Sequence, residues 1–349
     1  MNTPLPSSAW RGMRSLATLA VPFTLVCAAP ALAQWSHDPA VNLGVSTDPG
    51  DQNQAKLGTA PDGSTWVVWL DGISTGWDTV VQRLAPNGIK LLPGNGVIVA
   101  DTAFSSTQDY GFAVDDEGRA VVAYRDDANS GAPVQIVVQR VALDGTLEWG
   151  DGVQVSTVAG GNSPHCCVTS DGGAVVAWSN TMGGAQVQKV DAKGNVVWTA
   201  GGVTDAPAAG LYFVCDVASD GDGGAIVLYH HQTGGFSSPR HLKAQRFGAE
   251  DGAKLWNDGS PLVIFDGGSL QLGAFPALVP DGEGGIVTAW YDVSGTRNAY
   301  VQHVTADGEE LFPHNGVAIA ENVPNRIRIS AAADIDEATG DIYMVARES

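Results

Sequence analysis

The chain has 349 residues, 44 of them glycine, and carries 18 Lys and Arg against 38 Asp and Glu, a net charge of −20. Such a charge repels phosphate backbones and anionic lipid headgroups, so we expect no nucleic-acid partner and no binding to a membrane surface. Hydrophobic residues make up 44% and charged residues 16%, which excludes a disordered chain. The many glycines and prolines predict strands and tight turns rather than helices.

The first 33 residues have the composition of a secretory signal peptide. They contain no acidic residue, and Arg11 and Arg14 precede an apolar run from Leu16 to Ala29 that is too short to span a bilayer. We expect cleavage near Ala33–Gln34. The mature protein is then secreted or periplasmic, and it has no segment that inserts into a membrane.

The rest of the chain repeats one unit of short strands. Each unit contains an apolar strand that follows an Asp/Gly turn and ends in an aromatic residue, and these aromatics are Trp69, Tyr124, Trp178, Tyr229 and Trp290. A second strand follows in each unit and carries a glutamine, namely Gln82, Gln139, Gln188, Gln245 and Gln302. A glycine turn and a strand near a Trp or Phe complete four strands per unit.

A four-stranded antiparallel unit repeated in tandem is a blade of a β-propeller, whereas the competing β-solenoid has shorter coils. Five units are complete. Residues 329–347 begin a sixth, and Val41 to Val45 have the pattern of a fourth strand. We therefore predict an all-β fold, a six-bladed β-propeller formed by residues 34–349, whose last blade is split between the chain ends. In that blade Val41 to Val45 pair antiparallel within the sheet that contains Asp341 to Arg347. One strand is unaccounted for, so either this blade has three strands or the chain is truncated.

The pattern "DG-x-GGAIVAW…VQR…G…LW…GV" resembles the tandem propeller repeats of large exported bacterial proteins, which implies a repeat type and no activity. Residues 59–66 (TAPDGSTW) also resemble the Asp-box of sialidases. The turns before Trp149, Trp198 and Trp256 resemble the docking motif of pyrroloquinoline-quinone propellers. Neither of these two resemblances assigns a catalytic residue here, and no cofactor is expected.

Any ligand face of a propeller is expected where the loops vary. The loops between the second and third strands, and those between blades, emerge on one face and differ in length, and rigid scaffolds carry function on such loops. We name this the variable-loop face, and its candidate ligand residues are Asp71, Trp77, Asp126, His230, His231, His241 and Asp292. The three aspartates and Asn180 each lie two residues after a closing aromatic. They either ring the channel mouth or cap turns through Asx hydrogen bonds.

The histidines do not predict a metal site. His230 and His231 are adjacent on a strand, so their side chains point to opposite faces. No H-x-H or H-E-x-x-H spacing links them to His165. The repeated glutamines predict hydrogen bonds inside each blade, because a catalytic group would be needed only once. We expect the basic residue after each glutamine to face solvent on an outer strand.

Three cysteines remain after the signal peptide is removed, in a compartment where disulfides persist. Aligning Asp171 with Asp220 places Cys166 and Cys215 at one level on adjacent blades, so we predict a Cys166–Cys215 disulfide. A Cys167–Cys215 bond, a vicinal bond and reduced cysteines remain alternatives.

The sequence contains no G-x-S-x-G motif, and no paired catalytic carboxylates can be singled out. We therefore expect a monomeric, exported, non-enzymatic propeller that acts as a binding or scaffold module for a glycan or a protein. The alternative is a carbohydrate-active propeller enzyme, either a glycoside hydrolase or a polysaccharide lyase.

Overall fold

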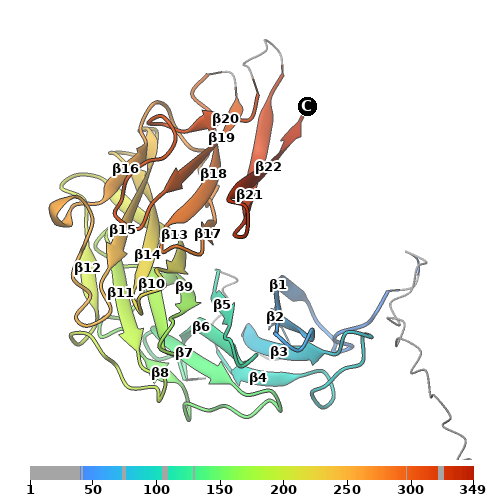
Figure 1. The fold of residues 1–349 in the computed structure, drawn as a ribbon. Helices are drawn as coiled ribbons and strands as arrows, with labels where there is room; N and C mark the ends of the chain where they lie inside the picture. The colour runs from blue at the N-terminus through green and yellow to red at the C-terminus, as the bar shows by residue number, and fades with distance from the viewer. Residues whose placement is uncertain are drawn as a thin grey trace, which may run out of the picture.

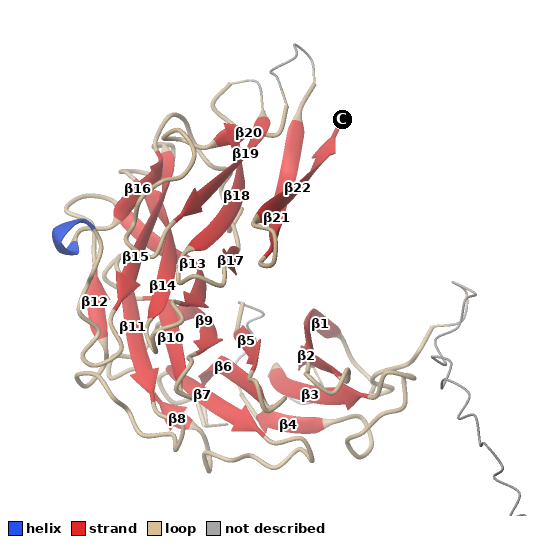
Figure 2. Cartoon of the chain, in the orientation of Figure 1, coloured by secondary structure: helices blue, strands red, loops and turns tan. Residues whose placement is uncertain are grey.

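The computed structural model describes residue 40 and residues 42–349, apart from 73–75, 104–108, 129, 296 and 321–325. The expected signal peptide, residues 1–33, lies outside the described residues. Strands and turns make up almost all of the described chain, in which the helical content is a short 3-10 turn at Asn257–Gly259 (Figure 2). In the described ranges, no helix has the length and apolar character needed to cross a membrane.

The strands form five consecutive four-stranded antiparallel sheets and a final two-stranded sheet. In chain order the bounds are β1 Gln52–Thr59, β2 Thr65–Asp71, β3 Asp78–Leu84, β4 Val97–Ala100; β5 Gly111–Val114, β6 Ala120–Asp126, β7 Gln135–Val141, β8 Val153–Gln154; β9 Asn162–Val168, β10 Ala174–Ser179, β11 Ala185–Val190, β12 Val203–Asp205; β13 Leu211–Ser219, β14 Ala225–Gln232, β15 Arg240–Phe247, β16 Leu262–Phe265; β17 Leu278–Pro280, β18 Ile286–Asp292, β19 Asn298–Val304, β20 Val317–Ala318; β21 Arg328–Asp336 and β22 Asp341–Glu348. Figure 1 shows these sheets as successive blades of an arc, with the first strand of each blade on the inner side. The predicted all-β propeller fold is confirmed, with five full blades and a half blade formed by β21 and β22.

The blades pack face to face through their second strands. In blade 2, Val122 of β6 faces blade 1, where it joins a core with Trp66 and Val68 of β2. The adjacent residue of β6, Val121, faces blade 3 and joins a second core with Val176 of β10. Because successive side chains of a strand point to opposite faces, a strand buried on both faces has a continuous apolar sequence. This is why every repeat contains a run such as Ala-Val-Val-Ala.

The repeated glutamine is buried in each full blade and bonds within that blade, as predicted. Gln139 is fully buried. Its Oε1 accepts from the backbone N–H groups of Arg140 and Trp149 at 2.9 Å each, and its Nε2 donates to the carbonyl oxygen of Gly150 at 2.8 Å. The same pattern recurs at Gln82, Gln188, Gln245 and Gln302. Each glutamine therefore fixes the loop that leads to the fourth strand.

The basic residue after each glutamine was expected to face solvent, and that prediction is wrong for blades 1 to 4. Lys189 Nζ lies 2.6 Å from Asp171 Oδ2 in its own blade and donates to the carbonyl oxygen of Gly223 in the next blade at 2.7 Å. Arg83, Arg140 and Arg246 likewise donate to a carboxylate of their own blade and to a carbonyl oxygen of the next blade. Neighbouring blades cover both faces of a sheet, so neither face is open to solvent at this position. We refer to Arg83, Arg140, Lys189 and Arg246 as the bridging cations.

Cys166, Cys167 and Cys215 lie in three different cores between blades, so the predicted Cys166–Cys215 disulfide is not formed. Cys166 packs in the core between blades 2 and 3, and Cys167 packs in the core between blades 3 and 4. Cys215 packs in the core between blades 4 and 5. Burial raises the pKa of the Cys166 thiol to about 12 and raises those of the other two thiols as well.

The predicted disulfide depended on an alignment that the strand pairing corrects. Val168 and Ser219 are the equivalent last residues of the first strands of blades 3 and 4, which is two residues away from the match assumed above. A β-bulge between Val214 and Asp216 also interrupts the pairing of β13. β9 is irregular at the same level, between the pairs His165–Ala177 and Asn162–Ser179, so Cys166 corresponds to Val217 and Cys215 corresponds to Pro164.

The described part of the N-terminal segment lies against blade 1. Val45 packs on a core of that blade, and the backbone N–H of Thr47 donates to Asn95 Oδ1 at 3.2 Å. Among the described residues, β22 pairs only with β21. Residues 42–45 therefore do not join the sheet that contains Asp341 to Arg347 as predicted, because contacts with blade 1 hold them elsewhere. Val41 lies outside the described residues. The arc remains open between blade 1 and the half blade (Figure 1).

Candidate functional site

Strand register brings chemically different residues to one height on the inner strands. In blades 1 to 4, one residue of the inner strand pairs with the residue just before the closing aromatic, and the pairs are Lys56–Val68, Gly111–Ala123, His165–Ala177 and Asp216–Leu228. Because the blades are structural repeats, these positions lie at the same level around the central channel. Three of the four carry side chains that can bear a charge.

These side chains form a continuous array with Asp109, the second residue before β5. Lys56 Nζ lies 2.7 Å from Asp109 Oδ1. His165 Nε2 lies 3.8 Å from Asp109 Oδ2, and His165 Nδ1 lies 3.7 Å from Asp216 Oδ1. The histidine distances exceed those of direct hydrogen bonds, so the imidazole lies between two carboxylates without being locked to either. We name Lys56, Asp109, His165 and Asp216 the channel cluster.

Backbone geometry positions Asp216 and brings the inner strands of blades 2 and 3 close together. The β-bulge in β13 immediately precedes Asp216, and bulges re-aim the side chains next to them. Asp216 Oδ2 then accepts the backbone N–H of Leu278 from blade 5 at 2.9 Å. On the other side, a Cβ at Gly111 would lie 2.5 Å from the backbone nitrogen of Cys166, so glycine permits β5 to approach β9 closely.

The cluster is open enough to meet a ligand. The side chains of Asp109 and Asp216 are 41% and 28% exposed, whereas that of His165 is 12% exposed. A cavity of about 490 Å³ runs along the inner strands of blades 2 to 5, and Asp216 is the one member of the channel cluster among its lining residues. Cavities of this size are typical of small-molecule sites.

The carboxylates predicted for the variable-loop face each make local hydrogen bonds. Asp71 is buried and accepts from Trp69 Nε1 at 2.8 Å. Asp126 accepts the backbone N–H of Ala128 at 2.6 Å, and burial raises its pKa. Asp292 accepts the backbone N–H of Ser294 at 2.9 Å. The contacts of Asp126 and Asp292 are those of turn caps, whereas Asp71 accepts from a side chain, and the structure does not gather these carboxylates into one group with the channel cluster.

The aromatic and histidine candidates of the same face lie in several places. Trp77 is half-buried and packs on the core between blades 1 and 2. His230 and His231 point to opposite faces of β14, as expected. His231 contacts the rings of Tyr212 and His241, whereas His230 contacts Phe213 and Phe275. Burial lowers the pKa of all three histidines, that of His230 to about 4.

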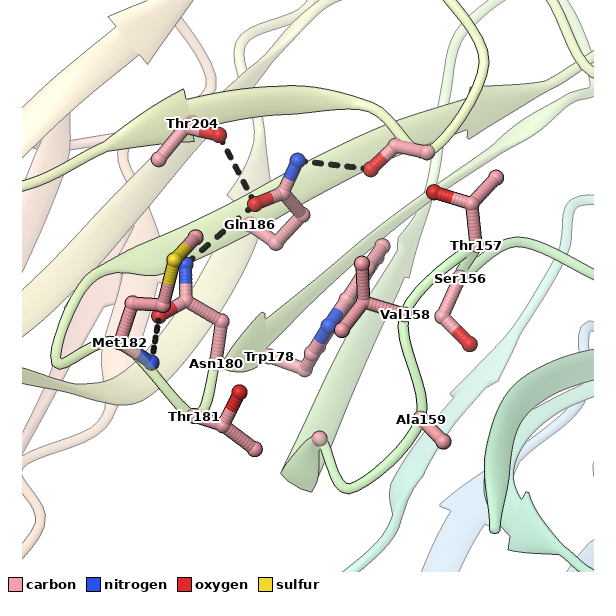
Figure 3. Close-up of a pocket in the computed structure, with 12 residues that line it drawn as sticks. Ser156, Thr157, Val158, Ala159, Trp178, Asn180, Thr181, Met182, Gln186 and Thr204 are labelled. Carbon is pink, nitrogen blue, oxygen red and sulfur yellow. Dashed lines mark hydrogen bonds between the residues drawn. The ribbon is translucent and has the colours of Figure 1, made fainter. Parts of the chain in front are cut away.

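A second cavity of about 170 Å³ lies between blades 2 and 3 (Figure 3). Its polar side chains bond to one another: Gln186 Oε1 accepts from Thr204 Oγ1 at 2.9 Å and from Asn180 Nδ2 at 3.4 Å, and Gln186 Nε2 donates to the carbonyl oxygen of Gly201 at 2.7 Å. No ionisable acid, base or histidine lines this cavity. Across the part of the chain that the structure describes, no group of three or more His, Cys, Asp or Glu residues is arranged to hold a metal ion.

No protein-family model matches the chain, and no curated protein does. Among solved structures, an α-L-arabinofuranosidase from Clostridium thermocellum is similar, with 14% identity, a TM-score of 0.40, and coverage of 75% of this chain and 94% of that one. An α-L-arabinanase from Penicillium chrysogenum has 14% identity, a TM-score of 0.44, and coverage of 85% and 93%. A polysaccharide lyase of family PL25, an ulvan lyase, has 13% identity, a TM-score of 0.48, and coverage of 82% and 76%.

By their names these neighbours are an arabinofuranosidase, an arabinanase and a polysaccharide lyase, and none is a scaffold module. The expectation of a non-enzymatic binding or scaffold module is therefore corrected, and the alternative stated with it is taken up as a proposal below. His165 could be noted from the sequence, whereas Lys56, Asp109 and Asp216 could not. Their position in the repeat identifies them. Lys56, His165 and Asp216 lie at equivalent positions of three inner strands, and the residue type at this position differs from blade to blade.

Proposed function

We propose that the chain is a carbohydrate-active propeller enzyme that hydrolyses glycosidic bonds at the channel cluster. The observation that carries this proposal is the strand register that brings Lys56, His165 and Asp216 to one height, with Asp109 between two of them. Lys56, His165 and Asp216 come from the inner strands of different blades, and Asp109 lies two residues before β5. Such strands hold side chains more rigidly than loops do, and rigid placement is what catalysis requires.

Glycoside hydrolysis requires one carboxyl group that protonates the leaving oxygen and a second that activates water. Asp109 and Asp216 are two partly exposed carboxylates on opposite sides of one imidazole. In this proposal they form the acid–base pair, and His165 passes a proton between them. Lys56 holds Asp109 in place and keeps a positive charge beside it.

The charge of the protein favours a neutral substrate. A lyase acts on uronic acid polymers, which carry many negative charges, and a chain with a net charge of −20 repels them. Hydrolysis of a neutral polysaccharide is therefore the preferred reaction, and β-elimination is the outcome against which it is tested.

The experiment is a degradation screen with the purified protein. Neutral polysaccharides (arabinan, xylan, glucan and mannan) and uronic acid polymers are incubated with it, and new reducing ends and unsaturated ends are measured separately. We expect reducing ends from a neutral polymer and no unsaturated ends. Asp109→Asn and Asp216→Asn should each lower kcat by about 100-fold or more, the usual contribution of general acid–base catalysis.

The matched control is Asp251→Asn, which makes the same change at an exposed turn far along the chain from the cluster. It should leave kcat unchanged. Unsaturated products would show that the reaction is elimination and not hydrolysis. Full activity of Asp216→Asn would show that the channel cluster does not take part in the reaction. A screen without any cleavage would show that the proposal is wrong.

A further inference from the structure

Two phenylalanines and a buried histidine lie next to the channel cluster on the side of the variable-loop face. Phe213 pairs with His230 and Asp216 pairs with Leu228, so the partners are two residues apart on β14 and share one face of that strand. Phe213 therefore lies on the same face of β13 as Asp216 and nearer to the N-terminal end of the strand, where the loop between blades enters.

Phe275 reaches the same place from the loop between β16 and β17. The His230 ring centroid lies 5.9 Å from that of Phe275, with the rings edge to face, and 6.2 Å from that of Phe213. Phe275 is 51% exposed, whereas His230 is 1% exposed. The imidazole thus lies behind an aromatic surface that remains open to solvent.

His230 has an unused hydrogen-bonding atom. Its Nε2 is buried and has no hydrogen-bond partner in the described residues, and the same is true of Nε of Arg240 on the adjacent strand β15. Buried polar atoms in proteins are almost always paired, so an orphaned one indicates a missing partner or a functional role. Burial, and the charge of Arg240 beside it, lower the pKa of His230 to about 4, so the ring is neutral near pH 7 and can either donate or accept.

We propose that Phe213, His230 and Phe275 form a sugar-binding subsite beside Asp216, a proposal that rests on the function proposed above. The exposed ring of Phe275 packs against the apolar face of a pyranose or furanose ring. His230 Nε2 is buried in the free protein, so it hydrogen-bonds one of the sugar hydroxyl groups after the aromatic side chains over it shift. Aromatic surfaces with a few placed polar atoms are the usual lining of small-molecule sites. A hydroxyl suits a neutral imidazole because each can act as donor or acceptor.

The test uses two variants and two independent readouts. Phe275→Ala and His230→Phe are assayed for KM and kcat on the polysaccharide found in the screen, and for retardation in gels that contain the same polysaccharide. Each variant should raise KM by about tenfold, with kcat within about twofold, because the lost contact is made equally in the ground and transition states. Tyr343→Ala, which removes a 61% exposed aromatic on β22, is the matched control and should keep the wild-type KM.

The melting temperature separates a binding role from a structural one. His230→Phe replaces a buried, unpaired nitrogen by carbon, so its melting temperature should equal or exceed that of the wild type while its affinity falls. Wild-type KM and gel retardation in both variants would overturn the subsite and leave the proposed hydrolysis intact. Retardation of an inactive wild type that Phe275→Ala abolishes would support the subsite and contradict the hydrolysis. A wild type that neither cleaves nor is retarded by any polysaccharide would overturn both.

Discussion

Replacing Lys189 by methionine tests whether the bridging cations hold the blades together. Lys189 is 3% exposed; its ammonium group lies 2.6 Å from Asp171 Oδ2 and donates to the carbonyl oxygens of Gly223 at 2.7 Å and Ala249 at 3.5 Å. The last two belong to blade 4. Lys189→Met keeps the apolar stem and removes every one of these contacts.

The expected cost follows from what each group loses. The Gly223 carbonyl is left without its charged donor, and an unpaired buried acceptor costs about 1–3 kcal/mol. The Ala249 contact is long and adds less. The Asp171 side chain is 52% exposed, so water replaces its lost partner and this part contributes about 1 kcal/mol at most. We therefore expect Lys189→Met to lower the free energy of unfolding by about 2–4 kcal/mol.

The measurement is urea denaturation followed by tryptophan fluorescence, with the midpoint and slope fitted for both proteins. Lys193→Met is the matched control, because Lys193 is exposed and lies in a turn of the same blade. It should change the free energy of unfolding by less than about 0.5 kcal/mol. If Lys189→Met were as stable as Lys193→Met, the contacts between blades would not be the reason for burying these cations.

Two further outcomes concern the cysteines and the pH dependence of stability. Cys166, Cys167 and Cys215 are buried and unpaired, so the native protein should not react with a thiol reagent near about pH 8. In urea all three thiols should react, and a reductant should leave the melting temperature of the native protein unchanged. A missing thiol in urea would indicate a disulfide. Burial of Asp281 raises its pKa, but hydrogen bonds from His303 and two backbone N–H groups outweigh burial, so the folded-state pKa lies below the usual value. The contribution of Asp281 to the free energy of unfolding is present above the unfolded pKa of about 3.9 and is lost as pH falls through the folded pKa. Asp281→Asn should therefore lower the free energy of unfolding by about 1–3 kcal/mol near pH 6 and by progressively less below about pH 4. A loss of stability that does not change with pH would contradict this.

The propeller was predictable because each repeat buries both faces of its second strand. That burial makes a run such as Ala174-Val175-Val176-Ala177 apolar throughout, and tandem copies reveal the blade. The burial of the basic residue after each glutamine was not predictable. Strand alternation shows that the side chains of Gln188 and Lys189 point to opposite faces of the sheet, but it does not show that neighbouring blades cover both faces.

The channel cluster was hidden for a different reason. Its members differ from blade to blade, so no repeated motif marks them. The height of Asp216 depends on where β13 turns into β14, and the pairing places that turn between Ser219 and Ala225. Placing the turn two residues too early matched Cys215 with Cys166 and produced the wrong disulfide. An error at the turn changes every pairing along the strand, and only the pairing register reports it.

The bridging cations give the arc a mechanical direction. Each one reaches from its own blade to the following blade, so blade 1 is linked to blade 2, and the links continue in series as far as blade 5. At blade 5 the corresponding residue is His303, whose side-chain nitrogen contacts Asp281 of its own blade. The half blade beyond it is held by apolar packing against β18 and β19 and by hydrogen bonds from Arg328 to Arg297 and Asn298, without a bridging cation from blade 5. A molecule stretched from its C-terminus should peel off the half blade at low force and then resist until the Arg246 link between blades 4 and 5 breaks.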